Sequence, residues 1–313
     1  MMSRTRRGVR AGATSPKGRT MDSALVSVGL PIALAIIMFG LGLSLTPADF
    51  ARIGRSPKAV VIILLVQVVL LPLVAFGLAK GFRLEPALAV GLLILAASPG
   101  GTTANLYSHL FRGDVALNIT LTAINSILAL VTLPLVVNLA LNHFGAGSDT
   151  VGIQPGKMIQ VFAIVLVPVA LGMLVRAKAP GFADRMDKPV RIASAILLAL
   201  VVIGAILGEE KAVDYFLQVG LVTSLFCVTS LVVGYAVPRI AGLTVPQSIA
   251  SGFEIGIHNS TLAIAVALTV LENTTMAIPS AIYGIVMFPI AAIFGFVLVR
   301  MVRPPADSTA KAA

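Results

Sequence analysis

The sequence predicts an all-α polytopic membrane protein with about nine transmembrane helices. Of the 313 residues, 58% are hydrophobic and only 12% are charged, whereas a soluble domain carries about 25% charged residues. The mean hydropathy is +1.00. Since each crossing of a bilayer takes about 20 apolar residues, this composition is enough for about nine crossings. It excludes a soluble enzyme.

Nine long apolar runs have the length of membrane-spanning segments. In hydrocarbon the backbone must satisfy its own hydrogen bonds, so each run is expected to be a helix. The runs lie at residues 22–44, 58–79, 86–110, 115–141, 157–176, 190–208, 216–237, 247–271 and 277–300. We expect one transmembrane domain over 22–303, a basic disordered tail at 1–21 and a short tail at 304–313.

The net charge of +10 is spread over short loops and tails between the apolar runs. We therefore expect contacts with anionic lipid headgroups and no nucleic-acid partner. Basic loop residues on the side of the C-terminus are Arg52, Arg55, Lys58, Arg112, Arg176, Lys178, Arg185, Lys188, Arg191, Arg239, Arg300, Arg303 and Lys311; those on the other side are Lys80, Arg83, Lys157 and Lys211. The positive-inside rule predicts a multi-pass protein of the inner (cytoplasmic) membrane, with a cytoplasmic C-terminus and an external N-terminus. The basic tail at 1–21 favours the opposite orientation, but the loops are more numerous.

Glu254 is an acidic residue in the middle of an apolar run. It lies in the stretch F-E-I-G-I-H-N-S at residues 253–260. A charged side chain inside a membrane is costly and needs a partner, and no Lys or Arg of the runs lies at a similar depth. The partner is then a proton, a protonated His258 or a bound metal ion. A protonated acid that bonds a neighbouring helix is the purely structural alternative.

The third run is interrupted halfway by the stretch S-P-G-G-T-T-A-N at residues 98–105. Proline removes a backbone donor and glycine permits non-helical torsions, so the helix is expected to break here. A simple proline kink is the alternative, but a kink needs no polar cluster after it. Gly256 weakens the eighth run in the same way. The predicted helix breaks comprise Ser98, Pro99, Gly100, Gly101 and Gly256.

Two interrupted helices at similar depth are typical of inverted-repeat transporters. In such proteins, freed carbonyl groups coordinate a cation, while the N-termini of half-helices attract an anionic substrate. Other polar residues within the runs add oxygen ligands of the kind that a hard cation such as Na⁺ prefers. These are Gln67 in the second run and Asn118, Thr122 and Asn125 in the fourth, which share one helix face.

Other function classes receive less support from the sequence. No P-loop motif is present, which disfavours an ATP-driven pump, and the single Cys227 excludes a cysteine metal cluster. A proton-coupled or efflux carrier, in which Glu254 and His258 titrate, is the nearest alternative. Two helix breaks are more typical of a transporter that works by alternating access than of a channel. An intramembrane enzyme would need a serine paired with His258, and no hydrolase motif surrounds the serines.

Four stretches that occur in order resemble the bile acid:sodium symporter family. They are I-I-M-F-G-L-G-L-S-L-T-P-A-D-F at 36–50, S-P-G-G-T-T-A-N at 98–105, R-G-D-V-A-L at 112–117 and E-I-G-I-H-N-S-T-L-A at 254–263. The resemblance extends from about residue 33 to 300. It implies two inverted repeats that form a panel and a core domain, with the two broken helices crossing in the core. It also implies that this chain lacks the first helix of the ten-helix members.

The resemblance implies a sodium-coupled symporter that imports an organic anion, and it implies up to two Na⁺ sites at the crossing. By position, the first site would use Glu254, Asn105, Asn118 and Thr122, together with position 104. The second would use Gln67, Glu254, His258 and the main-chain carbonyls of Ile255 and Ile257. The residues that would face the substrate are Asn259, Thr102, Thr103 and Gly101.

This chain departs from the family pattern at several of these positions. Ala104 and Asn118 stand where serine is common, and Val286, Met287 and Phe288 replace a polar cluster of close bile-acid-binding relatives. A small carboxylate is therefore at least as compatible with the sequence as a bile acid.

His258 stands where glutamine is usual. Imidazole offers nitrogen rather than oxygen, so the second sodium site is expected to be weakened or linked to a proton.

Overall fold

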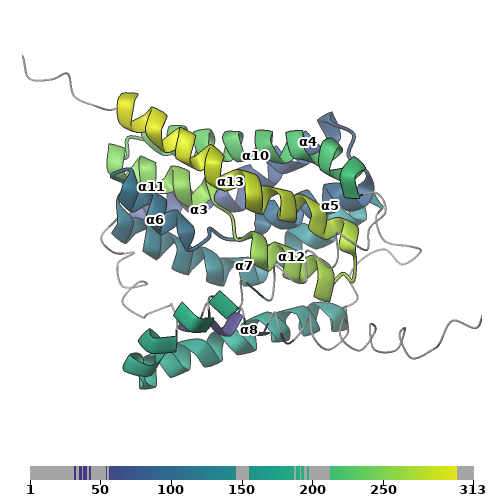
Figure 1. Ribbon diagram of the computed structural model, residues 1–313, viewed down its shortest axis with the longest axis horizontal. Helices are drawn as coiled ribbons and strands as arrows, with labels where there is room; N and C mark the ends of the chain where they lie inside the picture. Colours follow the sequence, from purple (N-terminus) through teal and green to yellow (C-terminus); the bar gives the residue numbers. More distant parts are fainter. Residues whose placement is uncertain are drawn as a thin grey trace, which may run out of the picture.

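The computed structural model describes residues 56–145, 155–186 and 212–301 without interruption, and scattered positions between 32 and 54 and between 188 and 196. Figure 1 shows that these residues form a bundle of helices. Within the described part of the chain no strand occurs, apart from one isolated bridge between Gly100 and His258. The prediction of an all-α protein is confirmed for this part.

The helices follow one another along the chain with short connections. They are α3 (Pro57–Leu65), the π-helical segment η2 (Val66–Leu70), α4 (Leu71–Gly81), α5 (Pro86–Ala97), α6 (Thr103–Leu110), α7 (Val115–Phe144), α8 (Pro155–Lys178), α10 (Ala212–Ile240), α11 (Val245–Gly256), α12 (Ser260–Thr269) and α13 (Thr274–Met301). The segments long and apolar enough to cross a membrane are Pro57–Gly81, Val115–Phe144, Leu217–Ile240 and Thr274–Met301. The chain is therefore a multi-pass membrane protein.

The predicted runs at 22–44 and 190–208 lie largely outside the described residues, as do the tails at 1–21 and 304–313. The third run, 86–110, forms α5 and α6, and the eighth, 247–271, forms α11 and α12. Each of these two runs is therefore a pair of half-helices.

Local sequence signals set several helix ends. Asp114 accepts a hydrogen bond from the backbone nitrogen of Leu117 at 3.0 Å and caps α7, which ends at Gly145 with a left-handed φ of 64°. Thr244 and Gln247 form a reciprocal capping box at the start of α11. These caps satisfy backbone groups that a helix end leaves free.

Two of the half-helices, α5 and α12, lie in the interior of the bundle. Every residue of α5 from Leu88 to Ala97 is buried, as are Leu262 to Leu268 of α12. Helix α13 packs against α5, α10 and α12, and α10 also packs against α11. The start of the first break, at Ser98, and most of the second, at Ile257 and His258, are therefore buried among other helices.

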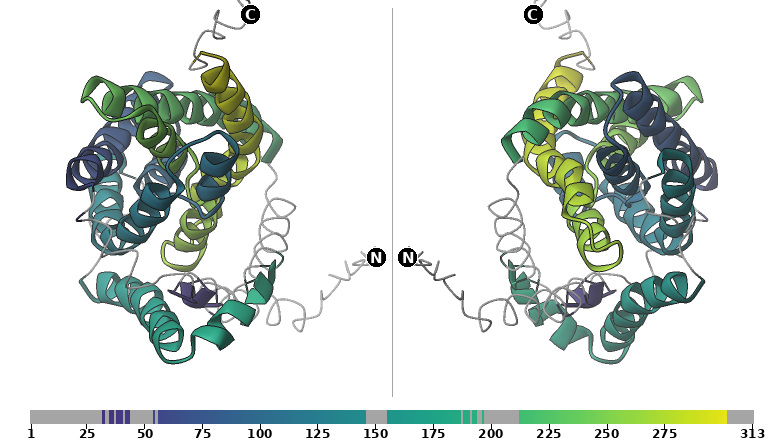
Figure 2. Two further views of the ribbon diagram at one scale, coloured as in Figure 1. Left: turned by 90° about the vertical axis from the view of Figure 1, so that its left-hand side faces the viewer. Right: turned by 90° about the vertical axis from the view of Figure 1, so that its right-hand side faces the viewer.

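Helix α8 lies along one side of this bundle, apart from most of its helices (Figures 1 and 2). Its main described contact in the bundle is with α7. It also packs closely against a helical stretch near residue 40, because a Cβ at Gly42 would overlap Val169 and one at Gly172 would overlap Phe39. Two small residues thus let these two segments approach closely.

Candidate functional site: the crossing of two broken helices

The first helix break begins where α5 ends at Ala97. Ser98 has extended backbone angles, with φ −71° and ψ 146°, and the helix resumes at Thr103. The second break lies between Gly256, the last residue of α11, and Ser260, the first of α12, with Ile257 at φ −113° and ψ 85°. Proline and two glycines in the first break, and one glycine in the second, provide the freedom that these torsions need.

The two unwound segments run antiparallel and pair through their backbones. The nitrogen of Gly101 donates to the carbonyl oxygen of Ile257 at 2.6 Å, and the nitrogen of Asn259 donates to the carbonyl oxygen of Pro99 at 2.8 Å. Gly100 lies opposite His258 between these two bonds. Backbone groups released by the breaks therefore satisfy one another, as a membrane interior requires.

Glu254 is fully buried beside this crossing. The hydroxyl of Thr122 donates to its Oε2 at 2.6 Å, and the amide of Asn125 donates to its Oε1 at 3.2 Å. No Lys or Arg of the described residues forms an ion pair with it. A Cβ on Gly100 would overlap the carboxylate, so the glycine leaves the space in which the acid lies. Glu254 thus has hydrogen-bond donors but no cationic partner in this part of the chain.

Asn118 connects three helices next to Glu254. Its amide nitrogen donates to the carbonyl oxygens of Ala104 and Ala250, each at 3.2 Å, and to the hydroxyl of Ser108. Its Oδ1 is buried and has no hydrogen-bond partner among the described residues, and the same holds for Oδ1 of Asn105. Two amide oxygens are therefore free to bind a ligand on the side of the crossing that α6 and α7 form.

Gln67 and His258 approach the first break from two directions. The Gln67 amide donates to the carbonyl oxygen of Ser98 at 3.0 Å and to that of Ala96 at 3.4 Å, and Nδ1 of His258 lies 3.3 Å from the same Ser98 oxygen. Oε1 of Gln67 and Nε2 of His258 are buried and have no partner in the part of the chain that the structure describes. Gln67 belongs to η2, and single π-helical turns are frequent at functional sites.

The other predicted ligand and substrate residues differ in burial and in their hydrogen bonds. The carbonyl of Ile257 accepts the bond from Gly101, and Ile255 is buried. Thr102 is exposed and Thr103 is half-buried, as Asn259 also is. Oδ1 of Asn259 accepts from the backbone nitrogen of Leu262 at 3.0 Å and caps α12. These three polar residues stand at the N-termini of α6 and α12, where backbone nitrogens favour negative charge.

Two contacts of the site are absent from the sequence-based ligand set. The sequence places Asn125 on a helix face shared with Asn118 and Thr122 but does not make it a ligand, although its amide donates to Glu254. Tyr283, on α13, donates a hydrogen bond to the carbonyl oxygen of Gly256 at 2.8 Å. The periodicity of α7 could have pointed to Asn125, whereas no local signal distinguishes Tyr283 from the apolar residues around it.

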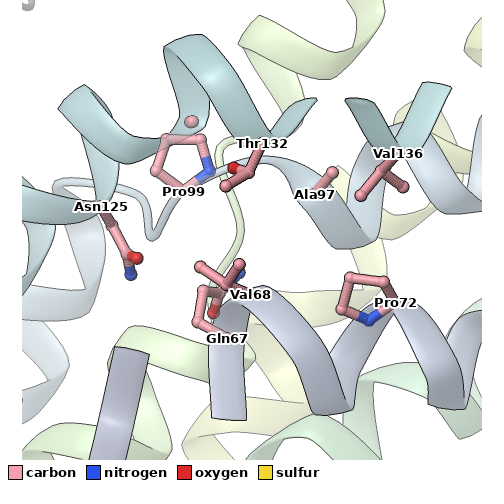
Figure 3. Close-up of a pocket in the computed structure, with 9 residues that line it drawn as sticks. Gln67, Val68, Pro72, Ala97, Pro99, Asn125, Thr132 and Val136 are labelled. Atoms are coloured by element: carbon pink, nitrogen blue, oxygen red, sulfur yellow. The ribbon is translucent and has the colours of Figure 1, made fainter. Parts of the chain in front are cut away.

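A small pocket opens beside the crossing, between η2, the end of α5 and α7. Gln67, Pro99, Asn125 and Thr132 contribute to its wall, together with apolar side chains. Figure 3 shows Gln67 and Asn125 at the same end of this pocket. It therefore extends from the buried polar groups toward the later turns of α7.

The chemistry of the site favours a hard cation. Among the described residues, buried amide oxygens of Gln67, Asn105 and Asn118 have no hydrogen-bond partner, and they belong to the segments that meet at the crossing. Oxygen ligands of this kind suit alkali and alkaline-earth ions. Over the described residues there is no group of three His, Cys, Asp or Glu side chains that could hold a transition metal.

Comparison with known proteins identifies a matching family model, described as the sodium bile acid symporter family, over residues 31–214. An uncharacterized sodium-dependent transporter of Bacillus subtilis is 32% identical over 270 residues, which cover 83% of this chain and 79% of that protein. The ileal sodium/bile acid cotransporter of Homo sapiens is 30% identical over 276 residues, covering 87% of this chain and 79% of that protein. A probable chloroplastic sodium/metabolite cotransporter of Arabidopsis thaliana is 29% identical over 262 residues, covering 81% and 62% respectively.

Proposed function

Since the chain belongs to the sodium bile acid symporter family, we propose that it is a secondary transporter that imports an organic anion together with Na⁺. The family is one of sodium-dependent transporters, and the relatives are named transporters or cotransporters rather than enzymes. The observation that carries the proposal is the fully buried carboxylate of Glu254 at a crossing whose segments hold buried amide oxygens with no partner among the described residues. Such a group is costly in a membrane unless a cation accompanies it.

The first sodium site, in this proposal, uses Glu254, Asn105, Asn118 and Thr122. It is supported by the free Oδ1 atoms of the two asparagines and by the Thr122 hydroxyl bonded to Glu254. Ala104 has no hydroxyl to contribute. Its carbonyl instead accepts a bond from the Asn118 amide, which aligns that side chain. Three side chains and the carboxylate thus supply oxygen ligands.

A second sodium site would use Gln67, His258, Glu254 and the carbonyls of Ile255 and Ile257. The free Oε1 of Gln67 supports it. The imidazole of His258 weakens it, because nitrogen is a poor ligand for Na⁺. The Ile257 carbonyl is moreover already bonded to Gly101. We therefore propose one strong site and one weak or proton-linked site.

The substrate binds, in this proposal, at the N-termini of α6 and α12. Thr102, Thr103 and Asn259 offer hydrogen-bond donors there, and the half-helix dipoles favour an anion. Val286, Met287 and Phe288 of α13 add no charged or strongly polar side chain. A bile-acid-like anion and a small carboxylate are the two substrate classes to compare.

Transport would proceed by alternating access around this crossing. We assign the half-helices and their neighbours to a core domain and α8 to a panel domain against which the core moves. Na⁺ neutralises Glu254 and links α6, α7 and α11, so that the substrate-binding arrangement is populated mainly when the ion is bound. The affinities for Na⁺ and for substrate should then increase together by the same factor.

The decisive experiment compares the thermal unfolding of the purified protein in NaCl and in choline chloride at equal ionic strength. Ligand binding at a hundred times its Kd stabilises a protein by about 2.7 kcal/mol, so Na⁺ should raise the Tm of the wild type. Glu254→Gln keeps an oxygen but removes the charge, and should lose this shift. Glu272→Gln, which alters an exposed acid in the connection between α12 and α13, is the matched control and should retain it.

Uptake by proteoliposomes then tests substrate and coupling. A bile acid and a panel of small carboxylates are offered with an inward gradient of Na⁺, or of protons in choline buffer. Uptake driven by protons alone would contradict sodium coupling. One Na⁺ transported with a monoanion carries no net charge, whereas two Na⁺ with a monoanion carry one positive charge and so produce a current. Each net charge that crosses the membrane is worth about 2.3 kcal/mol per 100 mV.

A further inference from the structure

The residues that line the pocket between η2, α5 and α7 are regularly spaced along their helices. On α7 it is lined by Asn125, Ala129, Thr132 and Val136, which follow one another at intervals of three or four residues and so lie along one face of the helix. On the opposite side it is lined by Gln67, Val68 and Pro72, along η2 and the start of α4. The pocket therefore runs lengthwise between two helices rather than across them.

The inner end of the pocket is polar and buried. Gln67 is 3% exposed, lines the pocket and has no partner for its Oε1 within the described residues. Asn125 is 2% exposed, lines the pocket and donates its amide to Glu254. The pocket thus ends one side chain away from the carboxylate. Figure 3 shows these two amides at the same end, with Pro72 and Val136 at the other.

The outer end of the pocket points to one side of the membrane. Helices α4 and α7 run in the same direction. Gln67, just before α4, lies at the same end of the pocket as Asn125 (Figure 3), and farther along both helices the ring of Phe76 contacts those of His143 and Phe144, with centroids 4.8 and 5.6 Å apart. The pocket extends along both helices toward the side on which α4 ends at Gly81 and α7 ends at Phe144. This is the side that the distribution of loop charges predicts to be external.

We propose that this pocket is the passage through which Na⁺ reaches Glu254 from the side on which α4 and α7 end. Amide and hydroxyl oxygens of Gln67 and Thr132 replace water around the ion as it enters, in the way that hard cations exchange oxygen ligands. Asn125 acts as a positioning residue, because its amide holds Oε1 of Glu254 toward the pocket. This inference rests on the proposed function, and it adds a route and a side to it.

The test labels the pocket through an introduced thiol. In a Cys227→Ala background, Thr132→Cys places a thiol on the pocket wall, and Val131→Cys places one on the outer face of α7, where Val131 is 63% exposed. Thiols react as thiolates, which form in water but not in lipid. A water-soluble methanethiosulfonate should therefore modify Thr132→Cys from the side on which α4 and α7 end, and should leave Val131→Cys unmodified.

The rates of Na⁺ binding and release then show whether the pocket is a passage or a binding site, because a blocked passage changes both rates but not the Kd. A bulky benzyl adduct at Thr132→Cys should slow both binding and release of radioactive Na⁺ by a common factor of about tenfold or more, which corresponds to a modest added barrier. The Kd and the Na⁺-dependent Tm shift should not change. The methyl adduct, which is much smaller, should leave the rates close to those of the unmodified protein.

Three results would overturn the inference. A Thr132→Cys thiol that no water-soluble reagent modifies would show that the pocket is dry or filled by lipid. Labelling only from the opposite side would place the entrance elsewhere. Unchanged rates with the benzyl adduct would show that Na⁺ takes another route. If the unmodified protein gives no Na⁺-dependent Tm shift, the proposed function itself fails, and the inference fails with it.

Discussion

The hydroxyl of Tyr283 on α13 donates a 2.8 Å hydrogen bond to the carbonyl oxygen of Gly256, the residue at which α11 ends. The thiol of Cys227 lies 3.9 Å from the same oxygen. The ring of Tyr283 also meets His258 edge-on, and Phe226 stacks on that imidazole, each with centroids 5.5 Å apart. Helices α10 and α13 thus fix the second break, although neither helix contributes a proposed sodium ligand.

The first prediction is that Tyr283→Phe weakens Na⁺ binding while keeping the ring contacts. A net hydrogen bond contributes about 1 kcal/mol, so the loss of this one should raise the Kd for Na⁺ by about fivefold. Isothermal titration with NaCl measures it. Tyr235→Phe removes a hydroxyl from a ring that packs against Phe294 on the same pair of helices, and should leave the Kd unchanged. Equal effects of both substitutions would argue against a positioning role for Tyr283.

The second prediction concerns the hydroxyl that bonds the buried acid. Thr122→Val keeps the shape of the side chain but removes the 2.6 Å bond to Oε2 of Glu254. Hydrogen bonds to charged groups contribute about 1.5–3 kcal/mol, so the affinity for Na⁺ should fall by at least about tenfold. The variant should still fold, because Thr122 lies on a long helix, α7, whose other contacts are kept.

Thr120→Val is the control for this prediction. Thr120 is equally buried on α7, but its hydroxyl bonds the carbonyl of Ala116 at 2.9 Å within the same helix. Titration of the Tm with NaCl should give the same midpoint for this variant as for the wild type. A parallel loss in both variants would indicate a general effect on α7 rather than a role of Thr122 at the carboxylate.

The third prediction tests the space that Gly100 leaves for Glu254. In Gly100→Ala the new methyl group would overlap the carboxylate, whereas in Gly101→Ala the nearest atoms, the carbonyl oxygens of Ile257 and His258, lie at 3.4 Å. Overpacking of this kind typically costs about 1–3 kcal/mol. Gly100→Ala should therefore lose the Na⁺-dependent Tm shift and Gly101→Ala should keep it. The reverse order would refute the packing of Glu254 against the first break.

The sequence predicted the parts of this arrangement that depend on local signals. Composition and the long apolar runs predicted an all-helical membrane protein. Proline followed by two glycines predicted the break after Ser98, and Gly256 predicted the end of α11. These features follow from the torsions and hydrogen bonds of neighbouring residues, which a single sequence displays directly.

Contacts between distant residues could not be predicted in the same way. The spacing of Asn118, Thr122 and Asn125 predicted a shared helix face, but not that Thr122 and Asn125 bond Glu254 while Asn118 bonds α6 and α11. Tyr283 gave no signal, because its partner belongs to another helix. Which side chain meets which depends on the packing of the bundle, and the periodicity of one helix does not contain that information.

A fourth prediction concerns the close contact between α8 and the helical stretch near residue 40. A Cβ on Gly172 would overlap the carbonyl oxygen of Phe39. Because backbone cannot move aside as a flexible side chain does, Gly172→Ala should destabilise the protein by about 1–3 kcal/mol. Gly77→Ala is the control, since a Cβ there meets nothing within 4 Å and alanine favours a helix by about 1 kcal/mol over glycine. Thermal unfolding without Na⁺ should show a lower Tm for Gly172→Ala and an equal or higher one for Gly77→Ala. The Na⁺-dependent shift should survive in both variants, because neither glycine lies at the crossing; its loss in Gly172→Ala alone would mean that α8 takes part in binding the ion.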